Sequence, residues 1–273
     1  MSEIKWCKVL YKHQPFEDNY TSKTFLDEME KNVNTKIYDL PRIIFESGVV
    51  SQQLSSICLF VSVFWYLEVK ILSPINLLFA LLLCFCIGVS FRKVIGKKGI
   101  GVSSCFIVSS FVFAISPILK TLTKSISTDT IYAMTTCMLL ANMLFQDYGA
   151  GAAIVSKVIS LNTSIFAAVC LGSRLSSSLQ VYAFVMLAVE VFALFPELRK
   201  DIKCWCRGAD IFLTEIMAIF TTLLLAPVSR IAACGLVLAH FMITFFFPIW
   251  MYRLQRYKNN IHGPWDEARI SNG

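Results

Sequence analysis

The fold is decided by the stretch SPILKTLTKSISTDTIYAMTTCMLLANMLFQDYGAGAAIVSKVISLNTSIFAAVCLGSRL, residues Ser116–Leu175. It contains two apolar runs, Ile131–Phe145 and Ile154–Leu171, which are separated by the small-residue turn Gly149–Ala153. Polar residues interrupt the runs without destroying their hydrophobic length, and Lys157 lies inside the second run. A charged group in an apolar span is costly in lipid and normally faces a bundle interior or a cavity. The stretch is therefore typical of the middle of a membrane helix bundle.

The composition of the whole chain agrees with this interpretation. Its 273 residues are 56% apolar and 16% charged, with a mean hydropathy of +0.64, whereas soluble domains average about 45–50% apolar and about 25% charged residues. A spanning helix needs roughly 20 mainly apolar residues. The sequence predicts an all-α fold, a polytopic membrane helix bundle with about eight transmembrane helices, from the runs Ile43–Leu67, Ile71–Phe91, Ile100–Leu119, Ile131–Phe145, Ile154–Leu171, Leu179–Phe195, Ile211–Ala226 and Ile231–Tyr252.

These runs divide the chain into an N-terminal tail over residues 1–42, a transmembrane bundle over residues 43–252 and a C-terminal tail over residues 253–273. In the first tail an amphipathic helix is expected from Thr24 to Asn34, with carboxylates in its first turn. No apolar region near the N-terminus resembles a cleavable signal peptide. Proline is best tolerated at helix ends, and six prolines fall at or near the ends of the runs: Pro41, Pro74, Pro117, Pro196, Pro227 and Pro248.

Lysine and arginine are distributed very unequally between the two sides of the predicted bundle. The two tails and the loops after the second and sixth runs hold nineteen, whereas the opposite side holds five: Lys70, Lys120, Lys124, Arg174 and Arg230. Because positive residues stay on the cytoplasmic side, both termini are expected in the cytosol. The net charge of +7 is then explained by attraction to an anionic leaflet, and nucleic acid is not expected as a partner.

Signals of soluble catalysis are weak in the sequence. It contains no Gly-rich phosphate loop after a strand, no GxSxG, no HExxH and no Asp-x-Asp pair, so we expect no catalytic residue, no metal site and no cofactor. Cys204-Trp-Cys206 lacks a second ligand pair for zinc, which makes palmitoylation or an inert pair the better interpretations. The longest predicted lumenal loop is Lys120–Thr130, in which Asp129 is placed to cap the following helix.

Charged residues within or beside the runs are the stronger functional signal. In the predicted topology they share the cytosolic half of the membrane, which indicates a lipid pocket or a subunit contact open to the cytosolic leaflet. The alternative is structural: Lys157 extends to the interface, and the carboxylates form ion pairs inside the bundle. The candidates for the pocket or contact are Glu46, Asp147, Lys157, Glu190 and Glu215.

Several segments carry a family likeness that runs from tail to tail. They include KWCKVLYKHQPFEDNY, FESGVVSQQL, SPILKTLTKSISTDTIYAM, DYGAGAAIVS, SLNTSIFAAVCLGSRL and RLQRYKNNIHGPWDEA, which begin at Lys5, Phe45, Ser116, Asp147, Ser160 and Arg253. The stretches STDTIYAM and NIHGPWDEA are the most specific. Together the segments resemble the PIG-C family, whose members are subunits of phosphatidylinositol N-acetylglucosaminyltransferase. The likeness is weakest over residues 71–115 and 199–244, and this chain has a short loop at Arg92–Gly99.

The resemblance implies a multi-pass protein of the endoplasmic-reticulum membrane. It would be a non-catalytic subunit of the complex that transfers N-acetylglucosamine from UDP-GlcNAc to phosphatidylinositol on the cytosolic face, the first step of GPI-anchor biosynthesis. The chain would scaffold the catalytic subunit PIG-A and could help to present phosphatidylinositol among the membrane lipids. The other implied partners are PIG-H, PIG-P, PIG-Q and PIG-Y.

Two other classes of protein fit the residues taken alone. A polytopic membrane transporter is compatible with eight helices and internal charges, although transporters often show repeated halves and no internal repeat is evident. An intramembrane enzyme could use Glu190 or Glu215 as a general base, and it would turn over substrate when purified alone.

Overall fold

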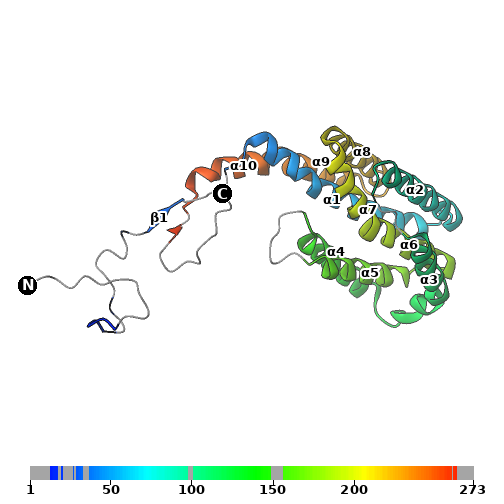
Figure 1. Ribbon diagram of the computed structural model, residues 1–273. Coiled ribbons are helices and arrows are strands. Elements are labelled where there is room, and N and C mark those ends of the chain that lie inside the picture. Colours follow the sequence, from blue (N-terminus) through cyan, green and yellow to red (C-terminus); the bar gives the residue numbers. More distant parts are fainter. Residues whose placement is uncertain are drawn as a thin grey trace, which may run out of the picture. The chain divides into compact units, whose positions relative to one another are not determined.

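A computed structural model (Figure 1) describes residues 13–17, 20, 27, 29–32, 37–97, 101–148, 156–259 and 261–262. The described chain is helical except for one pair of two-residue strands. It divides into two compact units, residues 41–248 and residues 1–40 with 249–273. The expected all-α membrane fold is confirmed.

The unit formed by the two chain ends contains the strand pair. Strand β1, Glu30–Lys31, pairs antiparallel with β2, Ile261–His262. Gln255 reinforces the pairing nearby, because its amide nitrogen donates to the carbonyl of Tyr38 at 3.0 Å and its oxygen accepts from the Tyr38 N–H at 2.7 Å. The helix expected through Asn34 is therefore wrong at Glu30–Lys31, where long-range backbone pairing prevails over a local amphipathic pattern. Most of the remaining residues of that helix lie outside the described residues.

The other unit, residues 41–248, contains most of the apolar helices, while the last stretch continues beyond residue 248. Six helical stretches of the described chain are long and apolar enough to cross a membrane, and each overlaps one of the eight expected runs. Two stretches are composite, since α6, η1 and α7 are continuous, as are α9, η2, α10 and η3. The helices are α1 Leu40–Glu68, α2 Pro74–Val94, α3 Val102–Leu122, α4 Thr128–Phe145, α5 Lys157–Gly172, α6 Ser178–Val189, η1 Glu190–Leu194, α7 Phe195–Trp205, α8 Arg207–Leu225, α9 Arg230–Phe241, η2 Met242–Phe246, α10 Phe247–Leu254 and η3 Gln255–Tyr257.

The two remaining runs form α4 and α5, which lie side by side (Figure 1). Helix α5 has 16 residues, fewer than the roughly 20 that usually span a bilayer, so the count of eight stays a prediction. The N-cap of α4 is Ser127, whose hydroxyl accepts from the Thr130 N–H at 3.3 Å. The expected cap Asp129 lies instead in the first turn, where its charge still favours the helix dipole. Lys157 is the first residue of α5 and not an interior one.

Three prolines lie inside helices, contrary to the expectation that they end them. Helix α3 continues through Pro117 to Leu122. The proline cannot donate to the carbonyl of Phe113, four residues back, and the hydroxyl of Ser116 donates to that carbonyl at 3.0 Å in its place. Pro196 and Pro248 each follow a five-residue π-helical turn, η1 and η2. A π turn changes the backbone bonding pattern locally and lets a helix accommodate such an interruption.

The core of this unit lies between α1, α5 and α6. Phe60 of α1 stacks on Phe184 of α6 with ring centroids 4.4 Å apart, and both side chains are fully buried. Within the most apolar 18 residues of each helix, 56% are buried in α1 and 50% in the α6–α7 stretch, whereas only 6% are buried in α2. The first two stretches therefore form the centre of the bundle, and α2 presents most of its surface outward.

Candidate functional site

Helix α7 extends α6 beyond the length that a membrane requires. The continuous stretch Ser178–Trp205 has 28 residues and is about 42 Å long, whereas the hydrocarbon core is about 30 Å thick. The sequence of α7, FPELRKDIKCW, is strongly amphipathic and rich in charge. The end of this helix is therefore suited to a polar edge of the membrane, the edge for which the lysine and arginine distribution predicts a cytosolic position.

Four charged side chains of α7 form ion pairs with four different parts of the chain. Arg92 of α2 lies 3.0 Å from Asp201, Asp147 of the α4–α5 linker lies 2.7 Å from Lys200, and Glu46 of α1 lies 2.5 Å from Lys203. The fourth pair joins Lys157 of α5 to Glu197. Since each partner belongs to another element, α7 connects α1, α2, α5 and the linker at one end of the bundle. Three of the predicted site residues, Glu46, Asp147 and Lys157, are thus brought to one helix.

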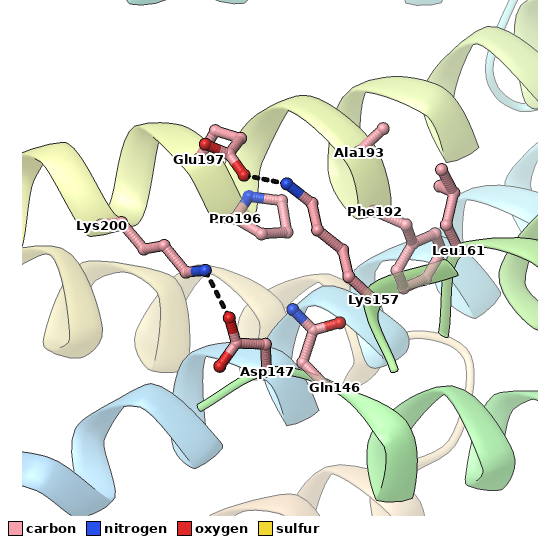
Figure 2. Close-up of a pocket in the computed structure, with 9 residues that line it drawn as sticks. All are labelled: Gln146, Asp147, Lys157, Leu161, Phe192, Ala193, Pro196, Glu197 and Lys200. Atoms are coloured by element: carbon pink, nitrogen blue, oxygen red, sulfur yellow. Dashed lines mark hydrogen bonds and ion pairs between the residues drawn. The ribbon is translucent and has the colours of Figure 1, made fainter. Parts of the chain in front are cut away.

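Two of these pairs border a small pocket (Figure 2). Figure 2 shows Lys157 directed toward Glu197 and Lys200 toward Asp147, with Gln146 beside Asp147. The far side is apolar, and the complete lining is Gln146, Asp147, Lys157, Leu161, Phe192, Ala193, Pro196, Glu197 and Lys200. Its cavity volume is about 50 Å³, well below the roughly 300–1,000 Å³ of typical small-molecule pockets. An inositol phosphate headgroup would need the ion pairs to open.

A fifth charged residue of α7 is turned into the protein. Arg199 is 1% exposed, and its Nη1 lies 3.4 Å from the carbonyl oxygen of Val49 in α1. Asp147 and Asp210 interact with the guanidinium electrostatically, and Asp210 is also 1% exposed. A buried charge of one sign is tolerated when opposite charges surround it, so Arg199 joins α1, α7 and α8 beneath the surface pairs.

The polar half of α1 links the same end of the bundle through hydrogen bonds. Gln52 donates to Oδ1 of Asp210 at 3.0 Å and to the hydroxyl of Thr214 at 2.7 Å, both in α8. Gln53 donates to Oδ1 of Asn142 in α4 at 2.8 Å, and Asn142 in turn donates to the carbonyl oxygen of Ser160 in α5 at 2.8 Å. The hydroxyl of Ser160 donates to Oε1 of Gln146, in the pocket wall, at 2.7 Å. Buried networks of this kind hold helices in one register.

The other two predicted site residues lie apart from α7. Glu215 of α8 interacts electrostatically with His240 of α9, whose Nε2 lies 3.3 Å from the hydroxyl of Ser55 in α1. Glu190 opens the π turn η1 and faces Cys84 of α2. The five residues therefore divide into three that meet α7 and two that lie at separate helix contacts. A single shared pocket therefore stays a hypothesis only for Glu46, Asp147 and Lys157, the three residues that meet α7.

The sequence interpretation missed the residues that hold this site together. It placed Arg199, Lys200 and Lys203 in a loop, because Pro196 was taken as the end of the preceding helix. A period of 3.6 residues in FPELRKDIKCW could have revealed the helix. Gln52 and Gln53 were noticed as polar, but nothing local in the sequence indicates their partners, which lie 158 and 89 residues away. No group of three or more metal-ligating side chains occurs in the described part of the chain.

The fold and site define a polytopic membrane protein whose helices are joined by ion pairs at one polar edge. A family model described as phosphatidylinositol N-acetylglucosaminyltransferase, GPI2, matches residues 6–266. The chain belongs to this family, and the resemblance read from its sequence is confirmed.

Individual relatives match over nearly all of the chain. The human PIG-C subunit of phosphatidylinositol N-acetylglucosaminyltransferase is 43% identical over 98% of this chain and 94% of its own length. A putative counterpart of that subunit from Dictyostelium discoideum is 38% identical over 97% and 80%. The GPI2 subunit of the same transferase from Schizosaccharomyces pombe is 34% identical over 96% and 86%. No solved structure matches the chain.

Proposed function

We propose that the chain is a non-catalytic membrane subunit of the complex that transfers N-acetylglucosamine from UDP-GlcNAc to phosphatidylinositol, at the start of GPI-anchor biosynthesis. Its relatives carry the names of subunits of that transferase, which supports a subunit role and displaces the transporter interpretation. The proposal places the chain in the endoplasmic-reticulum membrane, with PIG-A as the catalytic partner and PIG-H, PIG-P, PIG-Q and PIG-Y as further subunits.

The observation that carries the scaffold role is the ion-paired end of α7. Glu46, Asp147, Glu197 and Asp201 each lie against a lysine or arginine from another element. Paired carboxylates are stabilised in the charged form and brace helices against one another, whereas a general base is usually poised to accept a proton. The arrangement supports a preformed frame at the cytosolic edge, against which a soluble glycosyltransferase domain can dock.

The pocket between α5 and α7 supports a second task, the presentation of phosphatidylinositol. It combines an apolar wall with two lysines at the polar edge of the membrane, and an anionic lipid requires both features. Each lysine already neutralises a carboxylate, so lipid would have to compete for it. The pocket is therefore proposed as a site that opens in the complex.

The test uses the full chain, tagged and expressed in cells from which the native copy is removed. The proposal predicts that detergent-extracted chain co-purifies with UDP-GlcNAc-dependent transferase activity, and that cells without it lose this activity. Turnover per assembled complex should be unchanged by Glu190→Gln or Glu215→Gln. A fall of 100-fold or more in that turnover, typical for loss of a general base at about 10²–10⁴-fold, would contradict the non-catalytic role.

A further inference from the structure

Glu190 differs from the other acidic residues near α7 in its surroundings. It is half-buried at the start of η1, directly after α6, which packs on α2, and its charge acts on Cys84 of α2. Within the described residues its carboxylate has neither a hydrogen bond nor an ion pair, while Glu46, Asp147, Glu197 and Asp201 all have cationic partners. Counting from the first residue of α6, Glu190 lies about 18 Å along a helix that crosses about 30 Å of hydrocarbon.

An ionisable side chain at this depth is expensive unless something compensates it. Carboxylates in membrane spans almost always face a bundle interior or pair with another group. Helix α6 is buried over much of its surface, whereas Glu190, directly after its C-terminal end, is only partly buried. Its position in a π turn is a further local irregularity, and such turns occur frequently at functional sites.

The neighbouring face of α2 is open to a helix from outside. Only 6% of the apolar window of α2 is buried, and Ala80, Cys84, Leu83 and Ile87 are all exposed. The small side chains of Ala80 and Cys84 stand one helical turn apart and would let another backbone come close. Apolar surface next to an uncompensated carboxylate complements an apolar helix that carries one positive charge.

We propose that the α2–α6 seam at Glu190 docks a transmembrane helix of another transferase subunit that presents a lysine or arginine to this carboxylate. The inference rests on the proposed subunit role and adds to it a contact inside the membrane, separate from the frame formed by α7. A hydrogen-bonded ion pair at that depth compensates Glu190 and fixes the register of the incoming helix.

The experiment measures transferase activity recovered per tagged full-length chain after mild detergent extraction. Glu190→Leu, Glu190→Gln and Glu190→Lys remove or reverse the charge, and each is expected to lower recovery by about tenfold or more, because truncating one member of a buried charge pair leaves the other unpaired. Cys84→Trp blocks the seam sterically and should have a similar effect.

The matched control is Cys86→Trp. Cys86 is exposed on the same helix but about 200° around its axis from Cys84, so this substitution should leave recovery within about twofold. The isolated Glu190→Leu chain should be monodisperse and melt at or above the wild-type temperature, since no internal partner is lost. That separates a docking defect from misfolding.

The other possible outcomes distinguish a failure of the proposed subunit role from a failure of the docking inference at Glu190. If wild-type chain fails to recover transferase activity, the subunit role itself fails. If wild type recovers it and Glu190→Leu recovers it equally, the carboxylate faces lipid and the docking inference is overturned. Loss of association between two differently tagged copies, with the other subunits still recovered, would identify a second copy as the occupant and also overturn it.

Discussion

Arg199 makes the strongest residue-level prediction. Its guanidinium is 1% exposed, and Asp147 and Asp210 are its charged neighbours. Arg199→Ala removes a cation near the buried carboxylate of Asp210, and because the two groups make no direct ion pair we expect a cost below the roughly 3–5 kcal/mol of a broken buried pair. We expect a clearly lower melting temperature of the detergent-purified chain. Arg199→Lys should rescue part of it, because a lysine restores the positive charge but not the contact of Nη1 with Val49.

Two comparisons test the physical reason for that loss. Lys200→Ala removes a lysine whose side chain is 42% exposed and should cost no more than about 1 kcal/mol. Arg199→Met combined with Asp210→Asn removes both buried charges and should melt above Arg199→Ala alone, since the carboxylate is no longer unpaired. An equal loss in the single and double variants would show that packing, and not charge, is responsible.

Tyr148 carries a pH dependence that can be measured outside the spans. Burial raises the pKa of its phenol from 10.0 to about 12, although the nearby Arg199 acts in the opposite direction, and the hydroxyl donates to the carbonyl of Met143 at 2.7 Å. A raised pKa in the folded state means that the neutral form is favoured there. The stabilisation is complete below pH 10 and is lost as the pH rises toward 12.

The measurement compares the melting temperature of wild type and Tyr148→Phe across that pH range. At about pH 8 the variant should be slightly less stable, because it lacks the hydrogen bond to Met143. Between pH 10 and 12 wild type should lose more stability than the variant. The other tyrosines titrate in both proteins, so equal slopes would contradict a buried phenol at this position.

At the scale of the element, the register of α7 depends on the π turn before it. Pro196 has no N–H, so it cannot bond to the carbonyl of Phe192 four residues back. Pro196→Ala restores that donor and should let η1 convert to α-helix, which rotates α7 relative to α6 by up to about 100°. Glu197, Lys200 and Lys203 would then no longer face their partners.

Cross-linking between two cysteines measures this rotation. Glu46→Cys and Lys203→Cys replace a pair whose charged atoms lie 2.5 Å apart, and a short bismaleimide should cross-link the two cysteines in the presence of Pro196. Adding Pro196→Ala should slow cross-linking by about tenfold or more, since the rotation of α7 carries residue 203 away from residue 46. Pro74→Ala, at the first position of α2, is the control and should have no effect.

The same pair gives a second element-level prediction. Glu46→Lys places two cations together and should reduce the thermal stability of the chain, although partial exposure limits the cost to about 1 kcal/mol. Combining it with Lys203→Glu restores an ion pair in reverse order. The double variant should therefore recover most of the stability. If it is less stable than either single variant, the contact depends on more than charge, for example on the packing of Lys203 over the ring of Phe45 at 5.1 Å.

At the scale of the whole molecule, hydrophobic length and composition were enough to predict a polytopic helical membrane protein. They assigned Glu46, Asp147 and Lys157 a common depth, because depth in a span can be counted from its ends, and the structure pairs all three with α7. They could not reveal that α7 continues past Pro196, since a proline normally ends a helix and the compensating π turn has no clear sequence mark. Nor could they pair Gln53 with Asn142, because such contacts depend on helix packing.

Contacts at both ends of the α4–α5 hairpin favour a bundle of eight passes. At one end Lys157 pairs with Glu197 of α7. At the other end the guanidinium of Arg174 donates to the carbonyls of Thr123 and Ile126, beyond the end of α3, at 2.7 and 2.8 Å. The hairpin thus reaches from the α7 side of the bundle to the opposite side, even though α5 has only 16 residues.

Labelling with a membrane-impermeant maleimide can decide between six and eight passes. In a cysteine-free background, Cys206 alone, in the exposed turn between α7 and α8, should react in sealed microsomes because positive residues mark that side as cytosolic. Val69→Cys, between α1 and α2 and 50% exposed, should react only after permeabilisation. Ala152→Cys in the α4–α5 linker should behave like Cys206 if the hairpin crosses the membrane. If it behaves like Val69→Cys, the hairpin does not cross and the bundle has six passes. If Cys206 reacts only after permeabilisation and Val69→Cys reacts in sealed microsomes, the ion-paired end of α7 lies in the lumen, away from the proposed cytosolic partner.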